Sequence, residues 1–465
     1  MNVVRVCESL TCELFGAHKL LQDIKKLENK NIKVVPGPCM GRCNVAPTVC
    51  VGKNYVDVAN FDKVKKTIDE KNFDPFIPDY INLSSYKKNG GYEIANKIKN
   101  GVISKKQVLD SLNESGLKGK GGAGFPTGKK WEIVSNYNGK KYVAVNGDEG
   151  EPGTFKDRSY LESDPHRFLE GALIASYFIN AQKVYIYMRD EYPTVIKILL
   201  DEINKMEDEE IIPKDFFIVR RGAGAYICGE ESAMIESIEG KRGLPRHRPP
   251  YVAEIGLFGC PTLTNNLETL FWVRDIIEKG AKWFAEKGSN GNKGFHSFSV
   301  SGRVKNPGVK VAPAGITIQQ LIDKYCDGMA DGHTFKGYLP GGASGGILPA
   351  TMNDIPLDYG SKELMDAGCF LGSAAVVVLS DHDNMKDVAL NLLKFFEEES
   401  CGQCTPCRSG TEKTVKLMQE KNWNKEKLKD LSEVMAQASI CGLGQAATNP
   451  LNSVLKYFSN EITYD

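Results

Sequence analysis

Residues 399–408 read Glu-Ser-Cys-Gly-Gln-Cys-Thr-Pro-Cys-Arg and indicate how the C-terminal part of the chain is organised. Cys401, Cys404 and Cys407 form a C-x2-C-x2-C motif, and Cys441 follows about thirty residues later. This spacing lets one turn or helix start direct three sulfurs toward three corners of a cube. The remote cysteine takes the fourth corner, which completes the ligand set of a [4Fe–4S] cluster. Zinc is the alternative, although four-cysteine zinc sites usually show two C-x2-C pairs. Unligated core cysteines are the remaining reading.

The composition excludes several classes of function. The chain has 465 residues, 59 Lys and Arg against 59 Asp and Glu, and is 41% hydrophobic and 25% charged. A net charge of zero gives no argument for binding nucleic acid or an anionic membrane surface. No apolar run approaches the ~20 residues needed to cross a bilayer, and the start lacks a signal-peptide pattern. We therefore expect a cytoplasmic protein without direct membrane insertion.

The first 75 residues form a predicted small α+β unit with its own cysteines. Strands are predicted at 3–6 and 32–35, a helix at 14–27 and a hairpin within 49–58. Cys7 and Cys12 precede the helix, whereas Cys39 and Cys43 lie in a Pro- and Gly-rich loop after the second strand. Two cysteine pairs on two loops suit a [2Fe–2S] cluster, with zinc or an inactive relic as alternatives. Cys50 is left over.

A glycine-rich loop is the second strong motif. Residues 119–131 read Gly-Lys-Gly-Gly-Ala-Gly-Phe-Pro-Thr-Gly-Lys-Lys-Trp and contain G-x-G-x-x-G. A standard Rossmann fingerprint needs a strand in front of it, and here a polar, helix-like stretch precedes, so that assignment is rejected. Bare glycine backbone still lets a flat ring or a phosphate approach closely, and Lys129 or Lys130 could neutralise a phosphate.

Three further loops point to nucleotide chemistry. Residues 145–153 place Asp148, Glu149 and Glu151 among glycines directly after a predicted strand. These residues form either a solvent-exposed acidic turn without a binding role or a loop whose carboxylates accept hydrogen bonds from ribose or ribityl hydroxyls. Residues 220–233 read as a strand, a glycine-rich loop and a helix start, which favours phosphate binding. Residues 265 and 266 add an amide pair at a helix start.

The rest of the chain divides by its pattern. We predict a linker and helical segment at 76–115, an α/β unit at 116–294, a β-rich unit at 295–382 and a helical unit at 383–465. Isolated cysteines are expected to be small buried hydrophobes: Cys228, Cys260, Cys326 and Cys369. Strands are predicted at 142–146, 184–188, 216–219, 298–301, 309–311, 338–340 and 375–379, and helices at 105–112, 166–178, 194–206, 318–325, 385–398, 409–421 and 425–439.

Together, the motifs resemble the NADH-binding, FMN-containing flavoprotein subunit of respiratory complex I and of its soluble relatives. Those relatives include NAD-dependent formate dehydrogenases and hydrogenases. The resemblance covers roughly residues 100–450, and residues 1–75 resemble the thioredoxin-like [2Fe–2S] module of a partner subunit. It implies a multidomain α/β fold: a thioredoxin-like domain, a Rossmann-like FMN/NADH domain, a ubiquitin-like β-grasp domain and a helical bundle holding [4Fe–4S].

The resemblance also implies roles for individual residues. FMN and NAD(H) would lie on the glycine loop, with Phe125 stacking on a nucleotide ring and Lys130 near the FMN phosphate. Glu151 would face the nicotinamide, and Glu231 would contact NADH. The remaining expected cofactor contacts are Gly119, Gly121, Gly122, Gly124, Asn146, Asp148, Tyr226, Gly229, Glu230, Asn265 and Asn266. The family's cluster ligands correspond to Cys401, Cys404, Cys407 and Cys441, and those of the fused module to Cys7, Cys12, Cys39 and Cys43.

Several positions depart from the family pattern. Ile133 stands where some relatives have an aromatic residue, which puts one wall of the adenine pocket in doubt. Arg248 and Tyr251 replace a Lys and a Phe, and both still offer charge and a stacking face. We also expect no C-terminal ferredoxin module of the kind seen in many hydrogenase relatives.

The implied activity is hydride exchange between NAD(H) and FMN, with single electrons passing to or from the clusters. This reaction requires no acid–base residue from the protein. The resemblance favours a formate dehydrogenase, with a molybdopterin-containing large subunit and a ferredoxin-like [2Fe–2S] subunit as partners. An NAD-linked hydrogenase, including a bifurcating one, or complex I is the alternative. A different class of hypothesis is a cluster scaffold without a nucleotide site, or an N-terminal unit that only docks partners.

Overall fold

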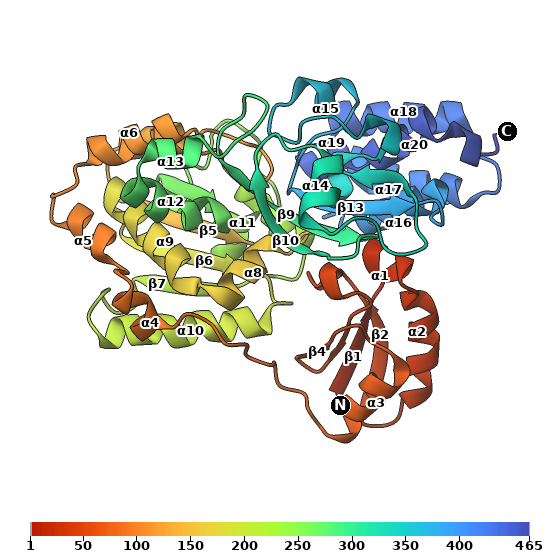
Figure 1. The fold of residues 1–465 in the computed structure, drawn as a ribbon, viewed down its shortest axis with the longest axis horizontal. Coiled ribbons are helices and arrows are strands. Elements are labelled where there is room, and N and C mark those ends of the chain that lie inside the picture. Colours follow the sequence, from red (N-terminus) through yellow and green to blue (C-terminus); the bar gives the residue numbers. More distant parts are fainter. Residues whose placement is uncertain (1, 465) are drawn as a thin grey trace.

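The computed structural model describes residues 2–464 and arranges them as three sheet-containing units and a C-terminal group of helices (Figure 1). The N-terminal unit lies at the lower right of Figure 1, where its cysteine loop contacts the middle unit. Its sheet has the order β2-β1-β3-β4, with β1 and β2 parallel and the remaining pairs antiparallel. Its elements are β1 Asn2–Cys7, α1 Leu10–Leu14, α2 Ala17–Ile24, β2 Ile32–Gly37, β3 Val49–Val51, β4 Asn54–Val56 and α3 Phe61–Asp69.

The prediction of one continuous helix at 14–27 is wrong. Gly16 adopts φ +83 between α1 and α2, and this left-handed conformation breaks the helix and turns the chain. The last residues, Lys25–Leu27, form a 3₁₀ turn. The break places Cys12 on the short helix α1, separate from the amphipathic helix that packs on the sheet.

The segment after residue 76 joins the core of the middle unit. Buried residues of α4 Leu83–Lys88, α5 Glu93–Lys99 and α6 Lys105–Ser115 belong to the same apolar core as the middle sheet. Tyr86 also donates its hydroxyl proton to Glu170 at 2.7 Å. These helices therefore stabilise the middle unit rather than act as a free connection.

The middle sheet is entirely parallel, in the order β7-β6-β5-β8. Its strands are β5 Tyr142–Gly147, β6 Lys183–Met188, β7 Phe217–Arg221 and β8 Thr262–Asn266. The order reverses direction at β5, and ligands of such sheets bind beside the carboxyl ends at that point. The covering helices are α7 Thr127–Ser135, α8 Lys156–Ser163, α9 Pro165–Ile179, α10 Pro193–Asp208, α11 Glu231–Ile238, α12 Leu267–Lys279 and α13 Ala281–Ala285.

The third sheet is mixed, in the order β10-β9-β13-β11-β12, with β9 and β13 parallel. The predicted strands and the predicted helix at 318–325 all fall on its elements, whereas the two-residue strand β12 was not predicted. The bounds are β9 Phe295–Gly302, β10 Gly308–Pro313, α14 Ile318–Tyr325, β11 Phe335–Leu339, β12 Leu348–Pro349, α15 Lys362–Asp366 and β13 Ala375–Ser380.

The C-terminal helices pack against one another beside the third sheet (Figure 1). They are α16 Met385–Glu398, α17 Thr405–Gln419, α18 Lys425–Ala438, α19 Gly442–Ala446 and α20 Asn449–Tyr457. The start predicted for α17 at residue 409 is wrong, because Pro406 fits the first turn of a helix and the helix begins at Thr405. Cys407 is consequently helical.

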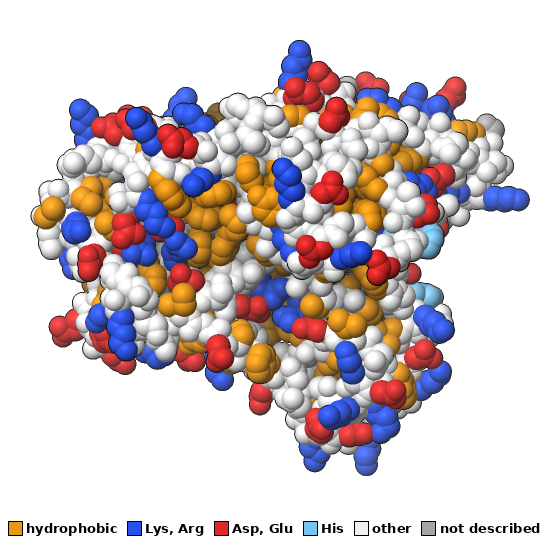
Figure 2. Space-filling model, in the orientation of Figure 1, with side chains coloured by type: hydrophobic (Ala, Val, Ile, Leu, Met, Phe, Trp, Pro, Cys, Tyr) orange, Lys and Arg blue, Asp and Glu red, His pale blue; other side chains and the backbone are white. Residues whose placement is uncertain are grey.

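Charges of both signs are interspersed over the face drawn in Figure 2, in keeping with the net charge of zero. Within residues 2–464, no helix has both the length and the apolar character needed to cross a bilayer.

Candidate functional site

A cavity of about 510 Å³ opens beside the carboxyl end of β5. Three units contribute to its wall, because Ser344 and Phe370 come from the third unit and Gly442 and Leu443 from the C-terminal helices. Eight residues of the predicted cofactor set line it: Gly121, Asn146, Asp148, Glu151, Tyr226, Gly229, Glu230 and Asn266. The cavity therefore brings together motifs that are more than one hundred residues apart in the sequence.

The remaining predicted contacts lie outside this lining. The glycine loop is closed by a hydrogen bond from the Gly119 N–H to the Phe125 carbonyl at 2.8 Å, and the chain then enters α7. A single bridge at Lys118, rather than a strand, precedes the loop, which agrees with rejecting a standard Rossmann fingerprint. Asn265 instead accepts a hydrogen bond from the Trp131 indole at 2.9 Å.

Exposed rings and a chain of charges occupy a neighbouring surface. Phe125 and Tyr251 are 41% and 58% exposed. Lys130 lies 3.7 Å from Glu231, and Arg248 reaches both Glu231, at 3.4 Å, and Glu230. Since Glu230 lines the cavity, the charge chain connects this surface to the cavity.

Two polar atoms in the cavity wall indicate that it is built for a polar ligand. Oδ2 of Asp148 and Oδ1 of Asn266 are enclosed, yet neither has a hydrogen-bond partner in the described part of the chain. Such atoms are costly unless a ligand or water satisfies them. Burial raises the pKa of Asp148 to about 7, against the opposing charge of Arg189. Hydroxyl and N–H donors, as in the ribityl chain and ring of FMN, fit these acceptors.

Glu151 is held by the third unit. Its Oε1 accepts hydrogen bonds from the Ser344 backbone N–H at 2.9 Å and from the Ser344 hydroxyl at 2.5 Å. Burial raises the pKa of Glu151, and these hydrogen bonds oppose the rise. A Cβ on Gly342, which has φ +81, would stand 2.7 Å from the Glu151 carboxylate carbon. A glycine at 342 is therefore required for Glu151 to occupy this place.

Sequence reasoning missed a buried ion network in the wall of the cavity. Lys156 lies 2.8 Å from Asp157 and 3.0 Å from Glu268, and the three side chains are almost fully buried. Asn266 donates to Asp157 at 2.7 Å, which fixes its amide so that its oxygen is left for the cavity. The only signal in the sequence was Lys-Asp directly after the acidic loop, and an adjacent charge pair does not indicate burial.

The C-terminal cysteines come together as predicted by their spacing. Cys401, Cys404, Cys407 and Cys441 all line one small void. Cys404 and Cys441 stand at the N-caps of α17 and α19, where backbone N–H groups face an anionic ligand. Burial raises the pKa of Cys441, and hydrogen bonds from the Leu443 and Gly444 N–H groups oppose the rise. Four gathered thiols with N–H donors fit an anionic iron–sulfur cube.

The cavity and the cysteine void share a wall. Ile227, in the 3₁₀ turn Tyr226–Gly229, and Leu443, in α19, line both spaces. Two apolar side chains thus stand between the cavity and the cysteine void.

The N-terminal cysteines also converge. Cys7, Cys12, Cys39 and Cys43 are each at most 4% exposed, and the sulfurs of Cys39 and Cys43 are 3.6 Å apart. Hydrogen bonds from Cys43 and Cys7, with the charge of Arg189, hold the pKa of Cys39 well below its usual range. Cys50 is buried nearby but points its thiol at the Gly52 carbonyl, 3.4 Å away. The four-cysteine arrangement fits a [2Fe–2S] cluster.

The four isolated cysteines behave as expected with one exception. Cys228, Cys326 and Cys369 are buried. The expectation is wrong for Cys260, which is partly exposed because it leaves the turn Leu257–Gly259 just before β8.

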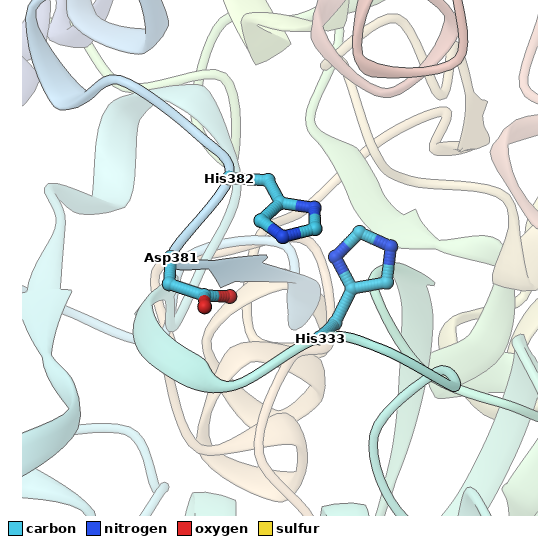
Figure 3. Close-up of side chains that lie close together, drawn as sticks. All are labelled: His333, Asp381 and His382. Carbon is cyan, nitrogen blue, oxygen red and sulfur yellow. The ribbon is translucent and has the colours of Figure 1, made fainter.

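Two imidazoles and a carboxylate also meet outside the cavity, at the end of β13. His333 and His382 face one another with the Asp381 carboxylate extended toward them (Figure 3), and their ligand atoms lie within 4.8 Å of one another. Two of the three groups already have protein partners: Nδ1 of His333 meets the Ser380 hydroxyl at 2.9 Å, and Asp381 accepts from the Thr334 N–H at 2.9 Å. These hydrogen bonds hold the loop before β11 against the end of β13. They explain why the three side chains lie close together without a metal ion.

Comparison with known proteins agrees with this geometry. Three family models match: a thioredoxin-like [2Fe-2S] ferredoxin at residues 1–72, the Nuo51 FMN-binding domain at 112–275, and the NADH-ubiquinone oxidoreductase-F iron-sulfur binding region at 387–465. The NADH-quinone oxidoreductase F subunit 2 of Rhizobium meliloti is 40% identical over 400 residues, which cover 83% of this chain and 94% of the relative. The chain belongs to the family of NADH-quinone oxidoreductase F subunits.

Other members and one solved structure extend the comparison. The F subunit of the NADH-quinone oxidoreductase of Aquifex aeolicus is 39% identical over 400 residues, covering 83% of this chain and 91% of that protein. A crystal structure of an NAD+-reducing [NiFe]-hydrogenase in the H2-reduced state has a TM-score of 0.87 at 28% identity. The structural alignment covers 99% of this chain and 83% of the hydrogenase chain. The predicted family, multidomain α/β fold and cofactor set of FMN, [4Fe–4S] and [2Fe–2S] are confirmed, and the chain is an oxidoreductase subunit of the NADH dehydrogenase type.

Proposed function

We propose that FMN occupies the 510 Å³ cavity and exchanges electrons between NAD(H) and a [4Fe–4S] cluster on Cys401, Cys404, Cys407 and Cys441. The observation that carries this proposal is the shared wall of Ile227 and Leu443. When bound, FMN converts between two-electron hydride transfer and single-electron transfer. The chain supplies binding, orientation and a short path.

The residues of the cavity take separate tasks. Asp148 and Asn266 accept hydrogen bonds from the flavin through their unpartnered oxygens. Glu151, fixed by Ser344, stands at the wall formed by the third unit and orients the nicotinamide by its charge and hydrogen bonds. Glycine at 121 and 229 keeps the cavity wall closely packed, because a Cβ there would stand 3.1 Å from Asn266 and 3.2 Å from the Asp148 carbonyl oxygen.

The dinucleotide enters over the neighbouring surface. Phe125 and Tyr251 offer exposed faces for stacking on a base. Lys130 and Arg248 carry positive charge that attracts the pyrophosphate, and their pairing with Glu231 keeps them in place before NADH binds. In this arrangement, the nicotinamide end reaches Glu151 and the adenosine end stays at the surface.

The test is cofactor content followed by reduction with NADH. The chain, purified anaerobically, should contain one FMN that bleaches on adding NADH, after which an EPR signal of a reduced cluster appears. Cys407→Ser should abolish the [4Fe–4S] signal and keep flavin bleaching, whereas Cys326→Ser, at a buried site in the third unit, should change neither. A flavin-free protein with intact clusters would support the scaffold hypothesis instead.

The remaining proposal concerns the enzyme complex to which this chain belongs. We propose the diaphorase subunit of an NAD-dependent formate dehydrogenase, with a molybdopterin-containing large subunit and a ferredoxin-like subunit as partners. One observation favours a second candidate, an NAD-linked hydrogenase: the hydrogenase structure matches 99% of this chain, including the N-terminal unit. Anaerobic purification of the native complex, with assays of NAD+ reduction by formate and by H2, separates the two. Association with membrane subunits would assign the chain to complex I.

A further inference from the structure

Two buried arginines of the middle unit hold the N-terminal cysteine loop. Arg189, directly after β6, donates to the Cys39 carbonyl at 2.6 Å. Arg158, in α8, donates to the Gly41 carbonyl at 2.8 Å. The two arginines are 4% and 7% exposed. A charge-assisted hydrogen bond in such a setting is strong, so the loop has one defined position on the middle unit.

Arg189 also reaches the loop that lines the flavin cavity. Its Nη1 donates to the Glu149 carbonyl at 2.7 Å, and its Nε donates to Glu191 at 3.1 Å. One rigid guanidinium group therefore joins the backbone of a proposed cluster ligand, Cys39, to the backbone of the cavity wall. A planar fork with several donors is required for this, and lysine has no such geometry.

The surrounding packing leaves little freedom at this junction. Gly41 adopts φ +63, and a Cβ there would stand 2.0 Å from the Tyr192 hydroxyl oxygen. That hydroxyl donates to Glu149 at 3.0 Å. Phe155 packs against Cys39 and Cys43 from the other side of the loop. The cavity loop thus has one face toward the flavin and the other toward the N-terminal cysteines.

We propose that Arg189 is a positioning residue for electron exchange between the flavin and the N-terminal cluster, and that its charge favours the reduced cluster. The inference rests on the proposed cofactor sites. In this electron transfer, the reduced flavin loses one electron and one ferric ion of the oxidised [2Fe–2S] cluster gains it. The added negative charge on the cluster is stabilised by a buried cation beside a ligand. The two hydrogen bonds of Arg189 fix the separation over which the electron moves.

The test is a redox titration of the [2Fe–2S] EPR signal in the intact holoprotein. Arg189→Gln removes the charge, and we expect about a tenfold lower ratio of reduced to oxidised cluster at a fixed potential, a shift of about 59 mV to lower potential. The [4Fe–4S] potential of the same sample should stay unchanged. Arg158→Gln is the matched control, since it removes a clamp on the same loop but is not adjacent to the Cys39 carbonyl.

A second variant separates charge from position and protects against failure to assemble. Arg189→Lys keeps the charge and loses the fork, so the midpoint should stay near the wild-type value while rapid-freeze EPR shows slower cluster reduction by NADH. Wild-type midpoint and rate in either Arg189 variant would overturn the role of Arg189. A wild-type chain without a [2Fe–2S] signal would refute the proposed ligand set and this role with it. A signal that is present but unchanged in the Arg189 variants would refute only the role of Arg189.

Discussion

Replacing Asp148 by asparagine should remove a pH dependence from flavin binding. Asp148 is enclosed at Oδ2, and burial raises its pKa to about 7 in the flavin-free chain. A hydroxyl or N–H donor of FMN makes a stronger hydrogen bond to an ionised carboxylate than to a protonated one, so the flavin favours the ionised form. Binding should therefore tighten as the pH rises through about 7.

The size of the effect follows from the pKa. With a pKa of about 7, only about 1% of Asp148 is ionised at pH 5, and about 90% at pH 8. If flavin binds only the ionised form, its affinity at pH 5 falls by up to about 100-fold relative to pH 8, equal to ~2.7 kcal/mol. The stability of the flavin-free chain moves in the opposite sense: a raised carboxyl pKa costs stability as the pH rises from about 4 to about 7.

Fluorescence quenching of FMN by flavin-depleted protein, measured across this pH range with the clusters intact, gives the affinities. Asp148→Asn keeps one acceptor and cannot ionise, so its affinity should be nearly independent of pH. Asp190→Asn is a control carboxylate, since Asp190 is exposed and paired with Arg221. A wild-type affinity that does not change with pH, or an equal slope in Asp148→Asn, would refute the reasoning.

Three shorter predictions follow. Gly342→Ala should displace Glu151 and lower kcat/KM for NADH about tenfold, ~1.4 kcal/mol. The control Gly328→Ala, also at positive φ but with open space around the added Cβ, should leave kcat/KM unchanged. Equal kinetics of the two variants would contradict the predicted clash. Glu231→Gln should mainly change the KM for NADH, since it frees Lys130 and Arg248 from an ion pair; loss of flavin with unchanged nucleotide binding would count against that role. Cys404→Ser should lower the iron content by about four atoms per chain while flavin stays bound, and unchanged iron would remove Cys404 from the ligand set.

The sequence predicted the elements with strong periodicity and the ligands with strong spacing. The strand at 142–146 and the helix at 318–325 lie within or coincide with β5 and α14, because alternation or an amphipathic pattern is local information. The eight cysteines likewise gather in two groups of four. Here, the chemistry of a short motif specifies its own geometry.

The prediction failed where the outcome depended on distant neighbours. Ser344 reaches Glu151 from 193 positions away, and its own segment reads as an ordinary glycine-rich turn. Strand β8 was missed because Thr-Leu-Thr-Asn-Asn has weak alternation and is a strand only through its pairing with β5. The helix predicted at 14–27 ran through Gly16 because apolar spacing continues across it, and only the backbone conformation there shows the break before α2.

The loop after β5 separates the cavity from the N-terminal cysteines. Asp148 and Glu151 line the cavity, whereas the Glu149 carbonyl accepts from Arg189 and Phe155 packs against Cys39 and Cys43. On the opposite wall, Leu443 touches the void of the C-terminal cysteines. With FMN in the cavity as proposed, the loop would set the distance to the N-terminal cysteines, and Ile227 and Leu443 would set the distance to the C-terminal ones. A change at the junction with the N-terminal cysteines, such as Gly41→Ala, whose Cβ would stand 2.0 Å from the Tyr192 hydroxyl oxygen, should therefore slow reduction of the N-terminal cluster more than that of the C-terminal one. Rapid-freeze EPR of both signals would show whether the two rates separate.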